Sequence, residues 1–267
     1  MAKPDEKYME ETIECVLTSQ PKPKLAVVSG NQAAEPEAVY GNPEMEYASI
    51  PNTLYNAKLA LVPEELATFV RTSQPQKWEL LVKRCDGEAQ ATKRLAERVS
   101  REIDMHGTIK MLRMDEVDVG EGVYVKLMYN RPASDKTPEH ITLYNLNRLG
   151  VMRQVHYSEK ATAEEVKMNP LLSIDMAIFL NGLPIITLEL KNELTGQTHH
   201  NAVKQFIKRR NPKGEKLLEF KRCLVHFAVG TEQVFMTTKL KGADTYFLPY
   251  NQSFANIGVE SEDYRTN

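Results

Sequence analysis

Cysteine is scarce in this sequence: only Cys15, Cys85 and Cys223 occur among 267 residues, and no two of them are close together. An odd number at such spacings argues against a disulfide framework and against a cysteine-rich zinc site. No run of about 18 apolar residues is present, so we expect no membrane span. The first residues also lack the apolar core of a signal peptide. These absences together predict a cytoplasmic protein.

Several enzyme signatures are missing as well. The sequence has no Gly-X-Ser-X-Gly, no His-Glu-X-X-His and no Gly-X-X-X-X-Gly-Lys-Ser/Thr phosphate loop, so this chain by itself should not hydrolyse ATP with P-loop machinery. Its net charge is −2, which argues against a basic protein that coats nucleic acid. Any anionic partner must therefore meet a local basic patch.

The pattern of apolar residues predicts helices first and strands later. A hydrophobic content of 42% is enough for a core, in one large domain or two small ones. Segment 19–52 is rich in Pro, Gly, Asn and Glu and is expected to be irregular. We expect helices at 7–18, 63–72, 76–83, 89–105, 138–146 and 201–210, with a continuation of the last to 220 as an open alternative. We expect strands at 108–112, 123–129, 151–157, 174–180, 183–190, 223–229 and 233–238. This order is typical of an α/β or α+β fold with a mixed central sheet.

The most informative segment runs from Ser173 to Lys191. It contains two apolar strands around an Asn-Gly turn, with Asp175 in the first strand and Glu189 and Lys191 at the end of the second. Buried charges are costly unless they are paired or bind a metal. Two carboxylates and one lysine at a sheet edge are typical of a Mg²⁺-dependent phosphodiesterase, because Mg²⁺ prefers oxygen ligands. A surface hairpin with a Glu–Lys pair is the simpler alternative.

The register of this hairpin decides between the two interpretations. A two-residue turn at Asn181-Gly182 places Asp175 opposite Leu188, on the face away from Glu189. A three-residue connection, Asn181 to Leu183, places Asp175 opposite Glu189, and a bulge within either strand has the same effect. We therefore predict an irregular hairpin.

Basic residues follow the second strand directly. A solvated helix face is the usual explanation of such a run, but its position beside an acidic pair favours contact with DNA phosphates. The candidate DNA-binding residues are Lys204, Lys208, Arg209, Arg210 and Lys213.

Three further residues are weaker candidates for metal ligands. His156 lies on a strand before Asp175, although a lone strand histidine is more often structural. Glu11 and Glu14 lie on the first predicted helix, where glutamates are usually solvated. Each of the three remains a minor hypothesis.

Larger stretches of the sequence resemble a known family. The Asp175…Glu189-X-Lys191 set is the signature of the PD-(D/E)xK nuclease superfamily. Residues 179–198, with shorter segments such as Arg153–Ser158 and Thr245–Asn251, resemble the nuclease region of the R subunit of type I restriction enzymes. This resemblance extends over most of the chain from about residue 55 onward.

The resemblance implies a restriction-endonuclease-like α/β fold, with a mixed sheet flanked by helices and a mainly helical N-terminal region. Together with the pattern described above, it implies an N-terminal helix and irregular segment at 1–52, an endonuclease domain at 53–255 and a linker at 256–267 to absent ATPase motor domains. Asp175 and Glu189 become ligands for Mg²⁺ (or Mn²⁺), and Lys191 becomes the catalytic lysine. Gln205 matches the glutamine of the family's Gln-X-X-X-Tyr element, whereas Arg209 stands at its tyrosine position.

The resemblance also implies a DNA substrate, ATP and partner subunits. In the family the nuclease cuts double-stranded DNA, ATP acts only in the full-length protein, and methyltransferase and specificity subunits complete the complex. Two rivals remain: a non-catalytic DNA-binding or docking module that kept the fold, and a nuclease of the junction-cutting or exonuclease type that acts alone.

Overall fold

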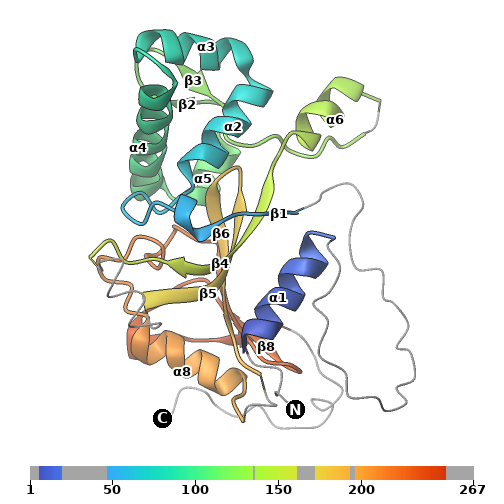
Figure 1. Ribbon diagram of the computed structural model, residues 1–267, viewed down its shortest axis with the longest axis vertical. Coiled ribbons are helices and arrows are strands. Elements are labelled where there is room, and N and C mark those ends of the chain that lie inside the picture. Colours follow the sequence, from blue (N-terminus) through green and yellow to red (C-terminus); the bar gives the residue numbers. More distant parts are fainter. Residues whose placement is uncertain (1–5, 20–46, 135, 161–171, 193–195, 251–267) are drawn as a thin grey trace.

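The computed structural model describes residues 6–19, 47–134, 136–160, 172–192 and 196–250, and Figure 1 shows their arrangement. The helices are α1 (Glu6–Leu17), α2 (Pro63–Ser73), α3 (Pro75–Arg84), α4 (Glu88–His106), α5 (Thr108–Arg113), α6 (Pro138–Asn145) and α8 (His199–Arg209), with short 3-10 turns η1 (Asn52–Leu54) and η4 (Gly242–Asp244). None of the described helices is both long enough and apolar enough to span a bilayer.

A seven-stranded mixed sheet forms the centre of the fold, as expected. The strands are β1 (Tyr47–Ser49), β4 (Leu149–His156), β5 (Ser173–Leu180), β6 (Leu183–Leu190), β7 (Val225–Val229), β8 (Val234–Thr237) and β9 (Leu248–Pro249), in that spatial order. The β1–β4 and β6–β7 pairs are parallel and the other pairs are antiparallel. A separate small ladder joins β2 (Val117–Asp118) to β3 (Tyr124–Val125). This α/β architecture is consistent with the restriction-endonuclease-like fold.

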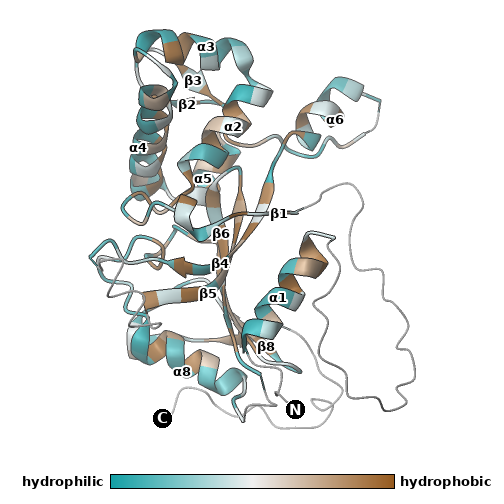
Figure 2. Cartoon of the chain, viewed as in Figure 1, coloured by the Kyte–Doolittle hydropathy of each residue, from teal (hydrophilic) through white to brown (hydrophobic). Residues whose placement is uncertain are grey.

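Helices cover the two faces of the sheet differently. On one face, α1 packs Met9, Ile13 and Leu17 against Val151, Met176 and Leu190. On the other, α8 packs Ala202, Val203 and Phe206 into a larger core with β4 and β5. The hydropathy of the chain follows this arrangement, because the strands are mostly apolar and the outer faces of the helices are polar (Figure 2).

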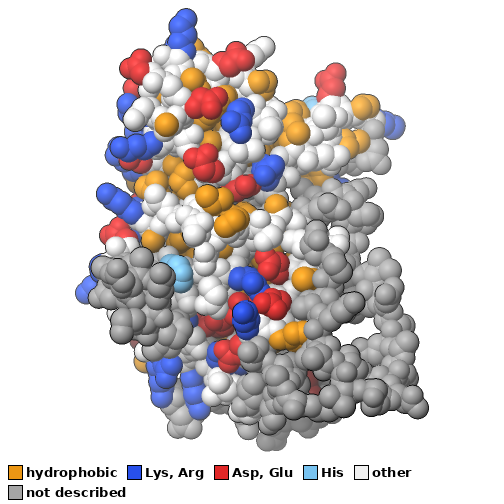
Figure 3. All heavy atoms as spheres, viewed as in Figure 1, with side chains coloured by type: hydrophobic (Ala, Val, Ile, Leu, Met, Phe, Trp, Pro, Cys, Tyr) orange, Lys and Arg blue, Asp and Glu red, His pale blue; other side chains and the backbone are white. Residues whose placement is uncertain are grey.

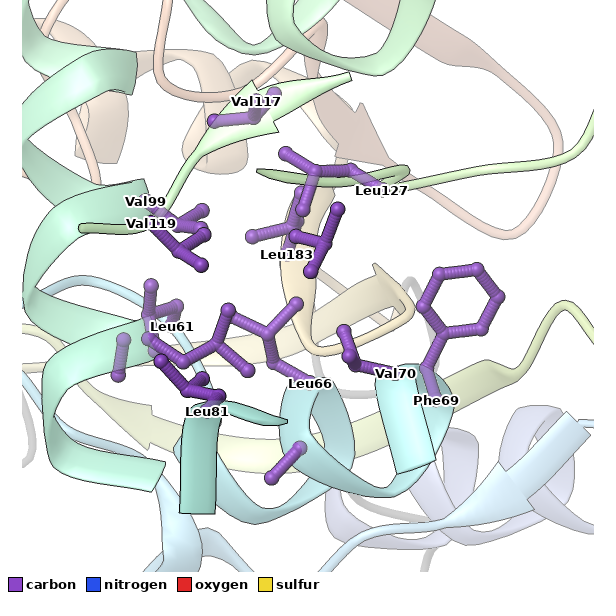
Figure 4. Packing of buried hydrophobic residues seen from close by; sticks show 14 of the residues in the cluster. Leu61, Leu66, Phe69, Val70, Leu81, Val99, Val117, Val119, Leu127 and Leu183 are labelled. Atoms are coloured by element: carbon purple, nitrogen blue, oxygen red, sulfur yellow. The ribbon is translucent and has the colours of Figure 1, made fainter. Parts of the chain in front are cut away.

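A third core lies at the turn end of the β5–β6 hairpin. There, α2, α3, α4 and the β2–β3 ladder surround Leu183, and Figure 4 shows Leu66 and Val70 of α2 and Leu127 close to it. In Figure 1, α2–α5 gather at one end of the molecule and α8 lies at the other. The hairpin therefore extends from an apolar helical region at its turn to the charged residues at its open end.

The segment 108–112 is helical, so the strand expected there was wrong. Thr108, Met111 and Leu112 are buried while Ile109 and Lys110 are exposed, which is a helical spacing and not an alternation. Other expectations differ at element ends. The strand expected at 123–129 is reduced to the two residues of β3, and α8 ends at Arg209, before the suggested extension to 220. The short strands β1 and β9 were not expected. Most of the irregular segment expected at 19–52 and the linker expected at 256–267 lie outside the described residues.

Candidate active site

The β5–β6 hairpin closes with a two-residue turn, so of the two irregularities considered from the sequence the three-residue connection does not form. Leu180 pairs with Leu183, and Asn181 and Gly182 both have positive φ (52° and 81°). The register then shifts by one residue, because Ile178 pairs with Ile186 while Phe179 pairs with Pro184. This bulge at Ile185 was the alternative expectation. Continued past the last pair, Met176 with Leu188, the register places Asp175 opposite Glu189.

Glu189 is fully buried and both of its carboxylate oxygens accept hydrogen bonds. Gln205 Nε2 of α8 donates to Oε2 at 2.6 Å, and Arg210 Nε donates to Oε1 at 2.6 Å. Burial and the nearby Asp175 raise the pKa of Glu189 to about 8, although Arg210 and Lys191 act in the opposite direction. Gln205 is thus in contact with Glu189, as a role in the site requires.

Asp175 lies beside this ion pair, nearly buried. Its Oδ2 accepts a hydrogen bond from the backbone N–H of Leu190 at 2.7 Å, and within the described residues its Oδ1 accepts none. Burial raises the pKa of Asp175, and Lys191 partly offsets that effect. Lys191 is also buried, and its Nζ lies 3.1 Å from Glu6 Oε2 at the start of α1. Asp175, Glu189 and Lys191 therefore meet at one end of the sheet.

Helix α1 adds an acidic residue that the sequence analysis missed. Glu10 is buried and accepts a hydrogen bond from Gln154 Nε2 at 2.7 Å. Burial and the nearby Asp175 raise the pKa of Glu10 to about 7. Gln154, which has a positive φ of 51° within β4, also accepts a hydrogen bond from Ser173 Oγ at 2.9 Å. The spacing of Glu6 and Glu10, one helical turn apart, was the available signal.

The weaker metal candidates lie elsewhere. Glu11 and Glu14 form ion pairs with Arg153 at 3.3 Å and 3.0 Å, on the part of α1 beyond Glu10. His156 pairs across the sheet with Ser173, and burial lowers its pKa. Among the described residues no group of three His, Cys, Asp or Glu side chains is arranged to hold a metal.

The basic residues of the α8 region separate into two groups. Lys204, Lys208, Arg209 and Lys213 are exposed, and basic side chains gather over α8 in Figure 3, while acidic and basic side chains mix over α1. Arg210 is the exception, and its assignment as a DNA contact was wrong. Its side chain is 0% exposed and forms the ion pair with Glu189, so a surface phosphate cannot reach it.

Arg210 also brings a tyrosine near the site from an unexpected element. Its guanidinium lies 5.5 Å from the ring centre of Tyr157, at the end of β4, and its Nη1 is 3.5 Å from the Tyr157 hydroxyl. Tyr157 therefore contacts the guanidinium that pairs with Glu189, whereas position 209 of α8 holds an exposed arginine. Nothing in the local sequence around Tyr157 indicates this contact.

Comparison with known proteins gives one match. The family model described as type I restriction enzyme R protein N terminus matches residues 67–245, more than half of the chain. The chain belongs to this family. The resemblance expected from the sequence is thereby confirmed, and membership of the R protein family assigns the chain to the nuclease part of a restriction system. No curated protein and no solved structure matches the chain.

Proposed function

We propose that this R protein N-terminal region is a Mg²⁺-dependent endonuclease that hydrolyses phosphodiester bonds of double-stranded DNA, driven in the full-length protein by ATP-powered translocation. The observation that carries the proposal is the bulged register, which brings Asp175 and Glu189 to the same face beside Lys191. Two buried carboxyl groups with raised pKa values gain stability from an added cation, so the donor set suits Mg²⁺.

Each residue has a proposed role. Asp175, through Oδ1, and Glu189 would hold the ion, with Glu10, whose pKa Asp175 raises, as a further carboxylate. When bound, Mg²⁺ polarises a phosphate oxygen and lowers the pKa of a water molecule. Lys191 stabilises the negative charge that develops on the phosphate, and Gln205 orients the Glu189 carboxylate.

Arg210 orients Glu189 from the opposite side to Gln205. Its ion pair fixes one carboxylate oxygen, and its charge offsets part of the negative charge of the pair. The exposed residues Lys204, Lys208, Arg209 and Lys213 are proposed to contact DNA phosphates beyond the site. Methyltransferase and specificity subunits would join through regions outside this chain.

A non-catalytic DNA-binding or docking module is the second candidate. The observation that favours it is that Gln205 and Arg210 already occupy both oxygens of Glu189. Titration with Mn²⁺, followed by isothermal calorimetry, separates the two. An endonuclease site binds the ion and loses that binding in Asp175→Asn, whereas a docking module binds none in either form.

The activity is tested in the assembled restriction complex with full-length R protein. We expect Asp175→Asn, Glu189→Gln and Lys191→Ala each to reduce cleavage at least about 1,000-fold while ATPase activity persists, because the motor does not use these residues. Glu139→Gln, an exposed acid on α6, is the matched control and should cut normally. Cleavage in excess chelator, or normal cleavage by Asp175→Asn, would show that the proposal is wrong.

A further inference from the structure

Outside the proposed nuclease site, an apolar cavity of about 650 Å³ opens beside α5. It lies where the helical region meets the sheet, between α5 and the 220–224 segment that leads into β7 (Figure 1). We call it the α5 groove and define it by Ile109, Lys110, Met114, Phe220 and Lys221, which line it. None of these residues has a role in the proposed nuclease site.

Large apolar side chains stand exposed around this groove. Ile109 is 55% exposed, Phe220 50% and Met114 36%, and Met105, next to the lining residue His106, is 55% exposed. Single exposed apolar residues need no explanation, but a cluster around one cavity is typical of a binding surface. Two of the four are methionines, whose flexible side chains adapt to a partner.

The rim of the groove is positively charged. Lys110, Arg113 and Lys221 line it, and Lys239 lies with its Nζ 4.5 Å from the ring centre of Phe220. Among the described residues that line the cavity there is no acidic side chain.

The two nearest acidic residues of α4 are already paired. Glu102 lies 3.7 Å from His106, and Asp104 binds both Lys216 and Arg222. Within the described part of the chain, Lys110, Arg113 and Lys221 form no ion pair with an acidic side chain. The groove therefore presents an apolar floor with cations at its edge, which complements an apolar surface with an acidic border.

The backbone of the groove is held in a strained form. Lys221 has a φ of +78°, a conformation that a lysine rarely adopts. Hydrogen bonds from Thr108 fix it, because the Thr108 N–H donates to Lys221 O at 2.9 Å and the Thr108 hydroxyl donates to Arg222 O at 2.6 Å. Strain that the surrounding structure maintains is a feature of binding sites, and it presents Phe220 and Lys221 together.

We propose that the α5 groove is a docking surface for an amphipathic helix of another polypeptide, with apolar anchors on one face and carboxylates along their border. A helix fits better than a strand, because β7 is paired on both sides and β8 is paired with β7 and, at Phe235 and Met236, with β9. A helix satisfies its own backbone, so only its side chains need complementary groups. The proposal does not depend on the proposed nuclease function.

The test uses the whole chain and three synthetic probes, each a fluorescein-labelled 20-residue helical peptide. The first has leucines at i, i+3, i+4 and i+7 flanked by glutamates, the second has lysines in place of the glutamates, and the third has the composition of the first in scrambled order. We expect fluorescence anisotropy to show at least tenfold tighter binding of the first peptide than of the other two, and weaker binding at higher salt.

Surface variants locate the binding. Phe220→Ala and Ile109→Ser should each weaken binding of the acidic peptide at least tenfold. Lys221→Glu should weaken the acidic peptide and strengthen the lysine peptide, a reversal that a merely unfolded protein cannot give. Leu80→Ser, which removes a 39% exposed leucine from α3, is the matched control and should bind normally.

Four results would overturn the proposal. Equal binding of the acidic and lysine peptides would remove the charge argument, and unchanged binding by Phe220→Ala and Ile109→Ser would place the site elsewhere. Self-association in sedimentation that Phe220→Ala abolishes would make a second copy of this chain the occupant. Tighter binding to phosphatidylcholine–phosphatidylserine vesicles or to a 20-base-pair duplex, lost in Lys110→Glu, would assign the groove to a membrane surface or to DNA.

Discussion

The two ends of the β5–β6 hairpin bury polar groups in opposite ways. At the turn, the Asn181 side chain accepts a hydrogen bond from Arg148 N–H at 2.7 Å and donates to Leu127 O at 2.8 Å, all within apolar surroundings. At the open end, charged groups from α1, β5, β6 and the end of α8 approach one another. Neutral hydrogen bonds at one end make a rigid structure. At the other end the cations only partly offset the buried carboxylates, which suits a bound cation and a phosphate.

Arg210→Met should be the most damaging change to stability. It leaves the buried Glu189 carboxyl without its cation, so Glu189 must stay charged or take up a proton, which costs up to roughly 3–5 kcal/mol of the free energy of unfolding. Glu189→Gln combined with Arg210→Met should recover part of that loss, because the double variant no longer buries a charge. Urea unfolding of both single variants and the double variant measures the coupling. Additive effects would mean that the ion pair contributes nothing of its own.

Gly182→Ala tests the turn end. A Cβ at Gly182 would lie 2.5 Å from Val62 O and 2.7 Å from Leu66 N, both backbone atoms that cannot move aside. Gly196→Ala is the matched control, since its φ of +78° is close to the +81° of Gly182 but no atom of the described residues lies within 4 Å of the added Cβ. We expect the control to lose about 1–2 kcal/mol from the left-handed backbone alone, and Gly182→Ala to lose at least about 2 kcal/mol more.

The same turn variant sharpens the comparison with the site. Gly182→Ala should lower stability without changing Mn²⁺ affinity at temperatures where the protein is folded. Asp175→Asn should weaken Mn²⁺ binding without lowering stability. A loss of metal binding in Gly182→Ala would mean that the turn sets the register of the open end.

The buried His226, between the two ends of the hairpin region, should make the stability of the protein depend on pH. Its Nδ1 lies 2.6 Å from Thr187 Oγ1, and burial lowers the pKa of His226 to about 4. Because the folded-state pKa lies below the unfolded value, this histidine contributes full stability above about pH 6.5 and loses it as pH falls towards 4. We expect a loss of about 2 kcal/mol between pH 7.5 and pH 5 from this residue.

The control for this pH dependence is His226→Gln, which should remove the contribution of His226 to the free energy of unfolding and leave the contributions of the other titrating groups. The acidic groups of the open end have raised pKa values and act in the opposite direction, since they lose stability as pH rises. Their contribution cancels when the pH dependence of urea unfolding is compared between His226→Gln and the parent protein. An identical pH dependence in both would show that His226 titrates normally.

The smallest effects are expected on the exposed face of α8. Lys208→Gln and Arg209→Gln should each weaken DNA binding a few-fold and lower the salt dependence of log K by about one unit, because each removes one phosphate contact. Stability should change by less than about 0.5 kcal/mol, since both side chains are exposed. The measurement is duplex binding at several salt concentrations, with Lys93→Gln on α4 as the matched control.

The sequence alone determined the elements that carry the proposed site. The apolar runs at 174–180 and 183–190 define two buried strands, and the Asn-Gly pair between them predicts their turn, because both residues tolerate positive φ. The sequence also predicted that Asp175, Glu189 and Lys191 lie on or at the end of these strands, and it showed the family resemblance. The local sequence pattern is enough to predict a strand or a turn where one backbone conformation strongly favours particular residue types.

Only the tertiary structure decided how these charges are arranged. The bulge at Ile185 has no signature in the sequence, yet it sets which face Asp175 takes, because one residue of slip reverses every side chain of a strand. Arg210 and Arg209 are adjacent and alike in the sequence, but α8 ends at Arg209 and packing directs Arg210 to Glu189. Glu10 is buried beside Asp175 while Glu11 pairs with Arg153, because α1 lies against the sheet with one face only. Burial and charge pairing depend on what lies opposite in space, and that is fixed by packing between elements distant along the chain.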